Sequence, residues 1–361
     1  MVTLAQEYQK NDIIHIWNEC FPGDSPEFID LYFTKKYKSE NTLVYLLEDK
    51  IASCLQILPY EMKYCGDVCP MFYISGAATL PEYRNRGLMK ELLLHAFQEM
   101  KNRGALFTTL IPQEEWLAGY YQKYGYTPCF DYITLWITRK ISVFDDLMFV
   151  TTLKTHELKE AYDYYQKQSE KHAIFVQKSF DDFTILCEEL KQRRGGEIYL
   201  CRRDDKICGL CFCYASVQRL QIFEMQGNNK NMKKIFLRKI IERYPQRKIY
   251  LMKCSSNKDL VPPTPKGMAR ILDAEKVLNL FALHHDEMKL TIKVNDEQIV
   301  ENNAVFCLEN GTCTRKENGN FDMEVNINLL TQLLLGYQIQ NLPQEYGIFP
   351  QNYPHMSLML E

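Results

Sequence analysis

A short turn containing two arginines and a glycine separates a segment of very small residues from a long segment of helical periodicity. The turn consists of Arg84, Asn85, Arg86, Gly87, Leu88 and Met89. The first backbone N–H groups of a helix have no intrahelical partner, and together with the helix dipole they favour an anion. The arginines add positive charge, and a glycine allows close approach to the main chain. The turn therefore predicts a binding site for a pyrophosphate group.

The segment before the turn, Tyr73 to Leu80, is predicted to be a strand built largely from small residues. These residues are Ser75, Gly76, Ala77, Ala78 and Thr79. Small side chains leave room for a slender ligand beside the backbone, and a glycine inside a strand indicates a bulge. We therefore expect Ala77, Ala78 and Thr79 to contact the same ligand as the turn. An Arg-x-x-Gly segment alone would also fit a solvated helix start.

A second helical segment and the residues just after it carry four tyrosines: Tyr120, Tyr121, Tyr124 and Tyr126. A phenol hydroxyl can donate a hydrogen bond or a proton to a leaving group in a reaction. Tyrosines at this spacing also pack together in a core. The residue types alone leave both interpretations open.

The elements that must position these residues follow from apolar periodicity and turn composition. Two helices are predicted within residues 1–40, and a hairpin within residues 42–58 that turns at 48–50. Further along, the predicted elements are a strand at 71–80, a helix at 84–103, a strand at 106–111, a helix at 114–123 and a strand at 132–138. This order predicts a mixed α/β sheet.

A second hairpin repeats the first. The segment Val44 to Ile51 resembles Ile198 to Ile207, with two extra residues in the second turn. In both cases an apolar strand, an acidic turn ending in lysine and another apolar strand follow helical segments. We interpret this as a duplicated α/β unit whose second copy lacks the arginine and glycine turn. Two unrelated hairpins remain the alternative.

The rest of the chain predicts a third domain. Residues 257–267 are rich in proline and are predicted to be a linker. A helix follows Met268–Asp273, then strands at 289–294, 304–308 and 323–327 and a helix at 329–335. The predicted domains are therefore 1–142, 143–260 and 261–361.

Composition limits the class of protein. Of 361 residues, 46% are hydrophobic and 25% are charged, and the net charge is −3. These values are ordinary for a globular protein and give no reason to expect nucleic acid as a partner. The sequence has no apolar run long enough for a bilayer and no export signal at its start, so we expect no membrane partner and a cytoplasmic location. The 13 cysteines are expected to be reduced, and Cys208, Cys211 and Cys213 to pack in a core rather than bind a metal.

The order of small-residue strand, turn, helix, strand and tyrosine-rich helix resembles the GCN5-related N-acetyltransferase (GNAT) superfamily. Its cofactor turn has the pattern Gln/Arg-x-x-Gly-x-Gly/Ala, which Arg84 and Gly87 match and Met89 does not. The whole chain further resembles the enhanced intracellular survival (Eis) acetyltransferases, in which tandem GNAT folds precede a sterol-carrier-like α+β domain. The segments that carry this resemblance are 83–89, 120–126 and 268–273.

The resemblance implies a function and site residues. Acetyl-CoA would be the co-substrate, with its pyrophosphate at Arg84–Met89, and no metal would take part. Tyr121 would be the general acid toward the coenzyme A thiolate. The C-terminal α-carboxylate, here that of Glu361, would be the base, although the family is associated with an aromatic residue at this position. His355 or a side-chain carboxylate are alternative bases.

The acceptor would be a primary amine, such as a polyamine, an aminoglycoside-like molecule or a lysine, attacked directly in a ternary complex. Asp24, Glu27 and Asp30 could attract such a cation or form a solvated helix face. Family members often assemble, so the resemblance allows a homo-oligomer. The alternative function is a non-catalytic protein that binds acyl-CoA or a lipid through the sterol-carrier-like domain.

Overall fold

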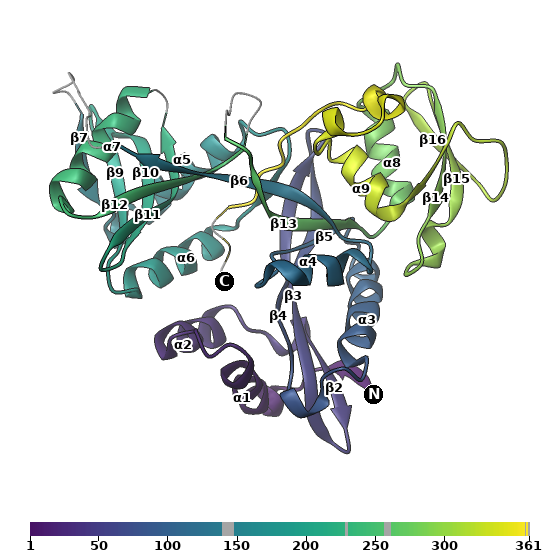
Figure 1. Ribbon diagram of the computed structural model, residues 1–361, viewed down its shortest axis with the longest axis horizontal. Coiled ribbons are helices and arrows are strands. Elements are labelled where there is room, and N and C mark those ends of the chain that lie inside the picture. Colours follow the sequence, from purple (N-terminus) through teal and green to yellow (C-terminus); the bar gives the residue numbers. More distant parts are fainter. Residues whose placement is uncertain (139–147, 228–229, 256–260, 358, 360–361) are drawn as a thin grey trace. The chain divides into compact units, whose positions relative to one another are not determined.

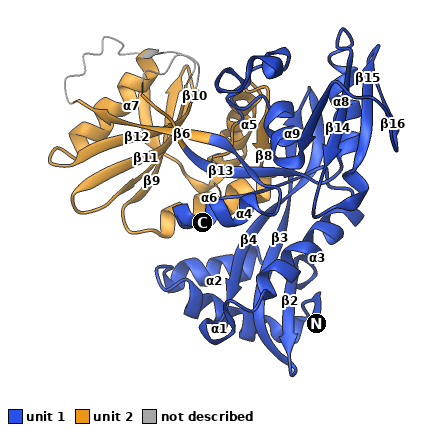
Figure 2. Ribbon diagram, turned by 45° about the vertical axis from the view of Figure 1, so that its right-hand side comes forward, with its two compact units in different colours: residues 1–130, 265–354 blue, residues 131–264, 355–361 orange. Residues whose placement is uncertain are grey.

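A computed structural model of the chain describes residues 1–138, 148–227, 230–255, 261–357 and 359 (Figure 1). The chain divides into two units, which are coloured separately in Figure 2. Unit 1 contains residues 1–130 and 265–354, and unit 2 contains residues 131–264 and 355–361. The predicted domain boundaries remain predictions.

The N-terminal part of unit 1 is a sheet in the order β1–β2–β3–β4–β5–β13, antiparallel except for the parallel pair β4–β5. Its strands are β1 (Val2–Leu4), β2 (Thr42–Leu47), β3 (Lys50–Tyr64), β4 (Asp67–Thr79), β5 (Phe107–Leu110) and β13 (Thr264–Ile271). Its helices are α1 (Lys10–Cys20), α2 (Pro26–Lys35), α3 (Leu88–Asn102) and α4 (Glu115–Gln122). Helices α1 and α2 contact one face of the sheet, and α3 packs on Leu55 and Ile57 of the opposite face.

Strand β13 corrects the prediction of a linker at 257–267. Residues 264–267 belong to this strand, which pairs antiparallel with β5 from Met268 opposite Leu110 to Ile271 opposite Phe107. Pro265 stands near the start of the strand, where a missing N–H costs little. The proline-rich composition therefore obscured a strand whose second half, Gly267–Ile271, is buried. Residues 256–260 lie outside the described residues.

The C-terminal part of unit 1 is a four-stranded sheet in the order β16–β15–β14–β17 with two helices (Figure 1). Its elements are α8 (Ala274–Leu283), β14 (Leu290–Asn295), β15 (Ala304–Glu309), β16 (Thr312–Lys316), β17 (Met323–Asn326) and α9 (Ile327–Leu334). Strand β16 was not predicted from the sequence. It is an edge strand with alternating exposed residues and a polar sequence, so no apolar run identifies it.

Unit 2 repeats the arrangement of the first sheet, in the order β6–β12–β11–β10–β9–β7. Its strands are β6 (Thr127–Ile137), β7 (Phe149–Thr152), β8 (Phe175–Gln177), β9 (Gly196–Arg203), β10 (Lys206–Ala215), β11 (Arg219–Gly227) and β12 (Lys248–Cys254). Its helices are α5 (Leu158–Ser169), α6 (Phe180–Gln192) and α7 (Lys230–Arg243). Here α7 covers the face that carries Cys211 and Cys213, and α5 and α6 meet Phe212 on the other face. The cysteines are packed in a hydrophobic cluster, and no group of three potential ligands that could hold a metal occurs among the described residues.

The two hairpins that suggested a duplication have the same turn. The turn residues are left-handed, with φ of 47° at Glu48, 64° at Asp49, 50° at Asp204 and 60° at Asp205. Two-residue turns of this kind match the twist of the paired strands. Because Arg203 pairs with Lys206, the two extra residues expected in the second turn belong instead to β9.

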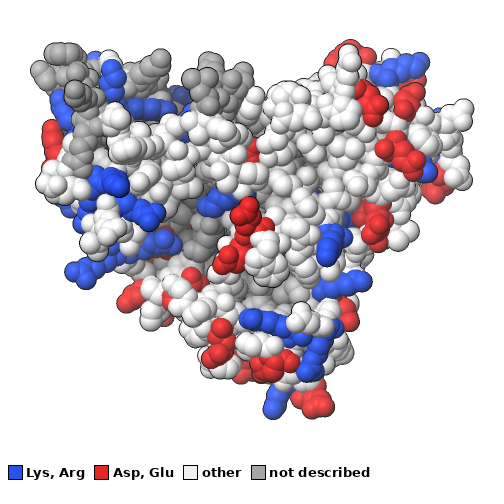
Figure 3. All heavy atoms as spheres, viewed as in Figure 1, with Lys and Arg blue, Asp and Glu red and all other residues white. Residues whose placement is uncertain are grey.

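The surface offers charges of both signs. On the face drawn in Figure 3, lysines and arginines lie next to acidic residues in several places, with uncharged areas between these groups. No helix in the described part of the chain is both long enough and apolar enough to cross a bilayer.

A fully buried ion pair connects the two parts of unit 1. Arg270 of β13 donates from Nη2 to both oxygens of Asp296, at 2.8 and 2.7 Å, and neither side chain is exposed. Its Nη1 donates to the carbonyl of Tyr124, and its guanidinium lies 4.5 Å from the centre of the Phe97 ring. A Cβ atom at Gly125 would stand 1.7 Å from Nη1, so only glycine fits beside this arginine.

We expect Arg270→Met to lower the free energy of unfolding by about 3–5 kcal/mol, because it leaves the Asp296 carboxylate buried without its cation. Urea denaturation followed by circular dichroism measures the change. The control is Lys289→Met, which breaks the exposed pair with Glu309 and should leave the transition midpoint unchanged. Equal effects of the two substitutions would contradict the assigned role of Arg270.

Candidate active site

The predicted anion-binding turn is exposed and is followed by the free end of a helix. Helix α3 begins at Leu88, four residues later than predicted, because Asn85 and Gly87 have left-handed φ values of 61° and 81° that a helix does not accept. Among the described residues, the N–H groups of Asn85, Arg86 and Gly87 donate to no main-chain carbonyl, and the helix start has no side-chain cap. The first amides of α3 are therefore open to an external anion.

The two arginines hold the turn in place. Arg84 Nε donates to the carbonyl of Thr79 at 3.0 Å, and Arg86 Nη2 donates to the carbonyl of Glu82 at 3.1 Å. The guanidinium of Arg86 also lies over the ring of Tyr83. Both side chains stay exposed, so their positive charges add to the field at the free amides without a desolvation cost.

The predicted bulge is present in β4. Between the pairs Cys54–Ala78 and Gln56–Ser75 the register shifts by one residue, and Gly76 has φ of 56°. A Cβ atom at Gly76 would stand 2.5 Å from the ring of Trp17. Packing and backbone conformation therefore both require glycine here. Ala77 and Thr79 are partly accessible and Ala78 is buried. Next to the turn, the strand therefore carries only small side chains.

Sequence reasoning missed a polar group behind this bulge. The hydroxyl of Tyr32 lies 3.0 Å from Gln56 Oε1 and 3.0 Å from Ser75 Oγ. Gln56 is fully buried, and its Nε2 has no hydrogen-bond partner among the described residues. The available signal was the pair of polar residues, Ser53 and Gln56, inside the otherwise apolar strand β3.

Tyr121 differs from the tyrosines around it. The hydroxyl of Tyr126 pairs with Thr108 Oγ1 at 3.1 Å, and Tyr120 interacts with Tyr124. In the described part of the chain no hydrogen bond is found for the Tyr121 hydroxyl, and burial raises its pKa to about 12. Its ring contacts those of Tyr120 and Tyr126. The phenol is therefore protonated at neutral pH and available to an external acceptor.

One hydrophobic cluster contains Tyr121 of α4 and residues of α3, and Ala77 of β4 and Met89 pack against it. Ala77 of β4, Met89 of the first turn of α3, and Leu92 and Leu93 of its second turn all pack in the cluster that contains Tyr121. Met89, which departs from the family pattern, is half-buried there. The structure thus gathers residues from three separate segments.

Side chains of the C-terminal part of unit 1 donate hydrogen bonds to the free carbonyls at the end of α4, the helix that carries Tyr121. The carbonyls at a helix C-terminus have no intrahelical donor. Asn328 Nδ2 donates to the carbonyls of Gln122 at 2.9 Å and Tyr126 at 2.7 Å, and Gln298 Nε2 donates to that of Lys123 at 3.3 Å. With the Arg270 bond to Tyr124, four carbonyls around this helix end are bound by residues more than 140 positions away.

The other predicted residues have different surroundings. Asp24 accepts a hydrogen bond from Trp17 Nε1 at 2.7 Å, whereas Glu27 and Asp30 are exposed on α2. Glu361 lies outside the described residues, so its predicted role is not tested. His355 is buried in unit 2, and burial, together with His172 and Lys178, holds its pKa well below its usual range.

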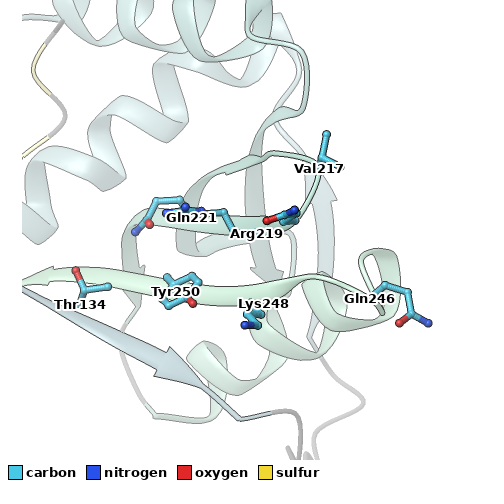
Figure 4. Close-up of a pocket in the computed structure, with 8 residues that line it drawn as sticks. Thr134, Val217, Arg219, Gln221, Gln246, Lys248 and Tyr250 are labelled. Carbon is cyan, nitrogen blue, oxygen red and sulfur yellow. The ribbon is translucent and has the colours of Figure 1, made fainter.

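A pocket of about 800 Å³ lies on the sheet of unit 2, beside β11 and β12 (Figure 4). Arg219, Lys248 and Tyr250 are among its lining residues, and none of the predicted site residues lines it.

Two family models match separate parts of the chain. Residues 2–129 match the model of an acetyltransferase (GNAT) domain, and residues 274–345 match a sterol carrier protein domain. Residues 2–129 therefore form a GNAT-type acetyltransferase domain. No curated protein matches it in sequence.

Solved structures share the fold of this acetyltransferase over nearly its whole length. A probable N-acyltransferase from Enterococcus faecalis is 16% identical with a TM-score of 0.81, covering 99% of this chain and 98% of the other. A GCN5-related N-acetyltransferase from Anabaena variabilis is 20% identical with a TM-score of 0.79, with the same coverages of 99% and 98%. Eis1 from Mycobacterium abscessus is 13% identical with a TM-score of 0.74, covering 99% of each chain. These likenesses confirm the predicted fold class and the resemblance to Eis-like proteins.

We expect Gly87→Ala to weaken binding of coenzyme A to the acetyltransferase about tenfold. A left-handed backbone costs a residue with a Cβ roughly 1–2 kcal/mol, which favours a turn with the amides misdirected. Isothermal titration calorimetry measures the affinity. Gly319→Ala is the control, because a Cβ there meets nothing within 4 Å and needs no left-handed backbone. Unchanged affinity in the Gly87 variant would exclude the turn as the pyrophosphate site.

Proposed function

We propose that the protein transfers an acetyl group from acetyl-CoA to a primary amine by direct attack in a ternary complex. Two observations carry this proposal. The turn 84–87 is exposed, and the amides of residues 85–87 have no main-chain partner among the described residues. The Tyr121 hydroxyl has no hydrogen bond within the described part of the chain, and its ring lies in the cluster against which Ala77 and Met89 pack. The amides would hold the pyrophosphate, with Ala77, Ala78 and Thr79 beside the pantetheine arm. The acceptor class is a small polyamine, an aminoglycoside-like molecule or a lysine.

The proposed reaction balances without a further reactant. The amine nitrogen attacks the thioester carbon, the carbon–sulfur bond breaks, and the products are an amide and coenzyme A. The amine loses one proton, and the thiolate gains one. Burial raises the pKa of Tyr121 to about 12, above the thiol pKa near 8.5. Complete proton transfer from the phenol to the coenzyme A thiolate is therefore energetically unfavourable. Tyr121 would therefore act mainly by donating a hydrogen bond to the developing thiolate.

The base is proposed to be the α-carboxylate of Glu361. A carboxylate is a weak base, so it would need partial desolvation or a bridging water. Supporting this proposal, the chain is buried shortly before its end, at Met356, Ser357 and Met359.

The activity is tested by mixing the protein with acetyl-CoA and a panel of amines and measuring free thiol. We expect release with at least one amine. Tyr121→Phe should lower kcat by about 10- to 100-fold, the range expected for loss of a hydrogen bond to a charged group.

The pH profile distinguishes the role of Tyr121 further. Because its pKa is about 12, the phenol stays protonated up to pH 10, and kcat/KM should rise with pH as the amine deprotonates, without a falling limb in that range. Tyr124→Phe is the control and should retain most activity. Unchanged turnover in Tyr121→Phe would remove this residue from the mechanism. Binding of acetyl-CoA without thiol release for any amine would favour the non-catalytic binding protein.

Deleting Leu360 and Glu361 tests the base. The deletion should lower kcat by at least about 100-fold, because general base catalysis typically contributes this much or more, while the affinity for acetyl-CoA stays the same. Calorimetry and the thiol assay measure the two quantities. Full activity of the shortened chain would exclude the terminal carboxylate.

A further inference from the structure

The pocket of about 800 Å³ in unit 2 lies on the face of the sheet opposite α7 (Figure 4). Successive residues of a strand point to opposite faces of a sheet. Leu220 of β11 and Ile249 of β12 pack in the cluster beneath α7, and the residues on either side of them line the pocket. The strand residues that line it are Thr134, Arg219, Gln221, Lys248 and Tyr250.

Two cations stand side by side in this pocket. Arg219 of β11 pairs with Lys248 of β12 in the parallel register, so both side chains leave neighbouring strands on the same face. Like charges at such positions repel each other. Within the described part of the chain neither side chain has a hydrogen bond or an ion pair, and no acidic residue is among those that line the pocket. The pocket therefore carries a positive charge that no described ion pair neutralises.

An aromatic row lies beside the two cations. Trp136 of β6 pairs with Tyr250 of β12, and Tyr250 pairs with Gln221 of β11. Gln221 pairs in turn with Tyr214 of β10. Trp136 is 68% exposed, and Tyr214 and Tyr250 are partly exposed. Accessible aromatic rings on a sheet face form a platform on which a planar ligand can stack.

The spacing of the two rows limits the shape of a ligand. Gln221 and Tyr250 each lie two residues after a cation on the same strand, and a strand rises by about 3.3 Å per residue. The aromatic row is therefore about 7 Å from the cations. A ligand that contacts both rows needs an anionic group a short distance from a planar ring.

This pocket does not occupy the place that corresponds to the anion-binding turn of the first copy. That turn follows the C-terminal end of β4 and its bulge. In unit 2 the corresponding bulge lies between Ile222 and Glu224, near the C-terminal end of β11 at Gly227. Arg219 and Lys248 are the first residues of their strands, at the opposite end. The pocket is therefore a feature of unit 2 that the duplication does not account for.

We propose that the pocket binds a small molecule in which a planar aromatic ring is joined to a phosphate, as in a mononucleotide. A phosphate monoester carries about two negative charges at neutral pH, which matches the two cations. The guanidinium of Arg219 and the ammonium of Lys248 hold the phosphate, and the ring stacks against Tyr250 and Trp136. This binding site goes beyond the proposed acetyl transfer and does not depend on it.

The first test titrates the full-length protein with flavin mononucleotide, a planar ring with one phosphate whose fluorescence falls when it stacks on tyrosine or tryptophan. Riboflavin has the ring without the phosphate, and ribose 5-phosphate has the phosphate without the ring. We expect flavin mononucleotide to bind at least about fivefold more tightly than either fragment, with ribose 5-phosphate measured by competition. Equal affinity for flavin mononucleotide and riboflavin, or no quenching at all, would overturn the proposal.

The second test places the bound flavin by substitution. Lys248→Gln and Trp136→Ala should each weaken binding at least about fivefold, because one removes a charge and the other a stacking surface. Both side chains are exposed, so the circular dichroism spectrum should not change. The matched controls are Lys239→Gln, exposed on α7, and Trp116→Ala, 72% exposed on α4. Neither control should change the affinity.

A third variant separates this site from the turn of unit 1. Gly87→Ala alters that turn and should leave the affinity for flavin mononucleotide unchanged. Weaker binding in Gly87→Ala together with unchanged binding in Lys248→Gln would overturn the pocket as the site. That outcome would leave the proposed acetyl transfer intact, and failure of the thiol assay would leave this proposal intact.

Discussion

The open amides at the start of α3 are the constraint on which the rest of the site depends. They exist because Asn85 and Gly87 adopt left-handed conformations that delay the helix to Leu88. The neighbouring strand has a bulge at Gly76, where the ring of Trp17 leaves no room for a Cβ atom. A ligand that binds these amides must therefore lie along β4, where the side chains are smallest.

The C-terminal part of unit 1 acts on this site through a helix end. Three carbonyls near the end of α4 are bound by Gln298 and Asn328 of this part, and a fourth is bound by Arg270 of β13. A short helix is marginal by itself, and unsatisfied carbonyls at its end would loosen it further. The sterol-carrier-like domain thus supports the element that presents Tyr121. The buried Arg270–Asp296 pair makes this support specific, since displacement would leave a charge buried without its partner.

Duplication has given two copies of one scaffold with different surroundings at the bulge. In unit 1 the bulge lies beside a turn with free amides and small residues. In unit 2 the corresponding strand bears Glu224, and the chain's own Ser357 is its partner. A carboxylate at this place would repel a phosphate and suits a hydroxyl donor. The second copy thus has internal side-chain contacts at the bulge and lacks the arginine and glycine turn of the first copy.

The sequence by itself determined the features that depend on neighbouring residues. Glycine and arginine at 84–87 specified the turn, small residues at 75–79 specified the thin strand, and repeated acidic turns revealed the duplication. Only the tertiary structure decided that 264–267 form a strand, that Tyr32 and Gln56 meet behind Gly76, and that the tail belongs to unit 2. The physical reason is that these contacts join residues far apart in the chain. Local periodicity carries no information about which distant strand, arginine or carboxylate a residue will meet.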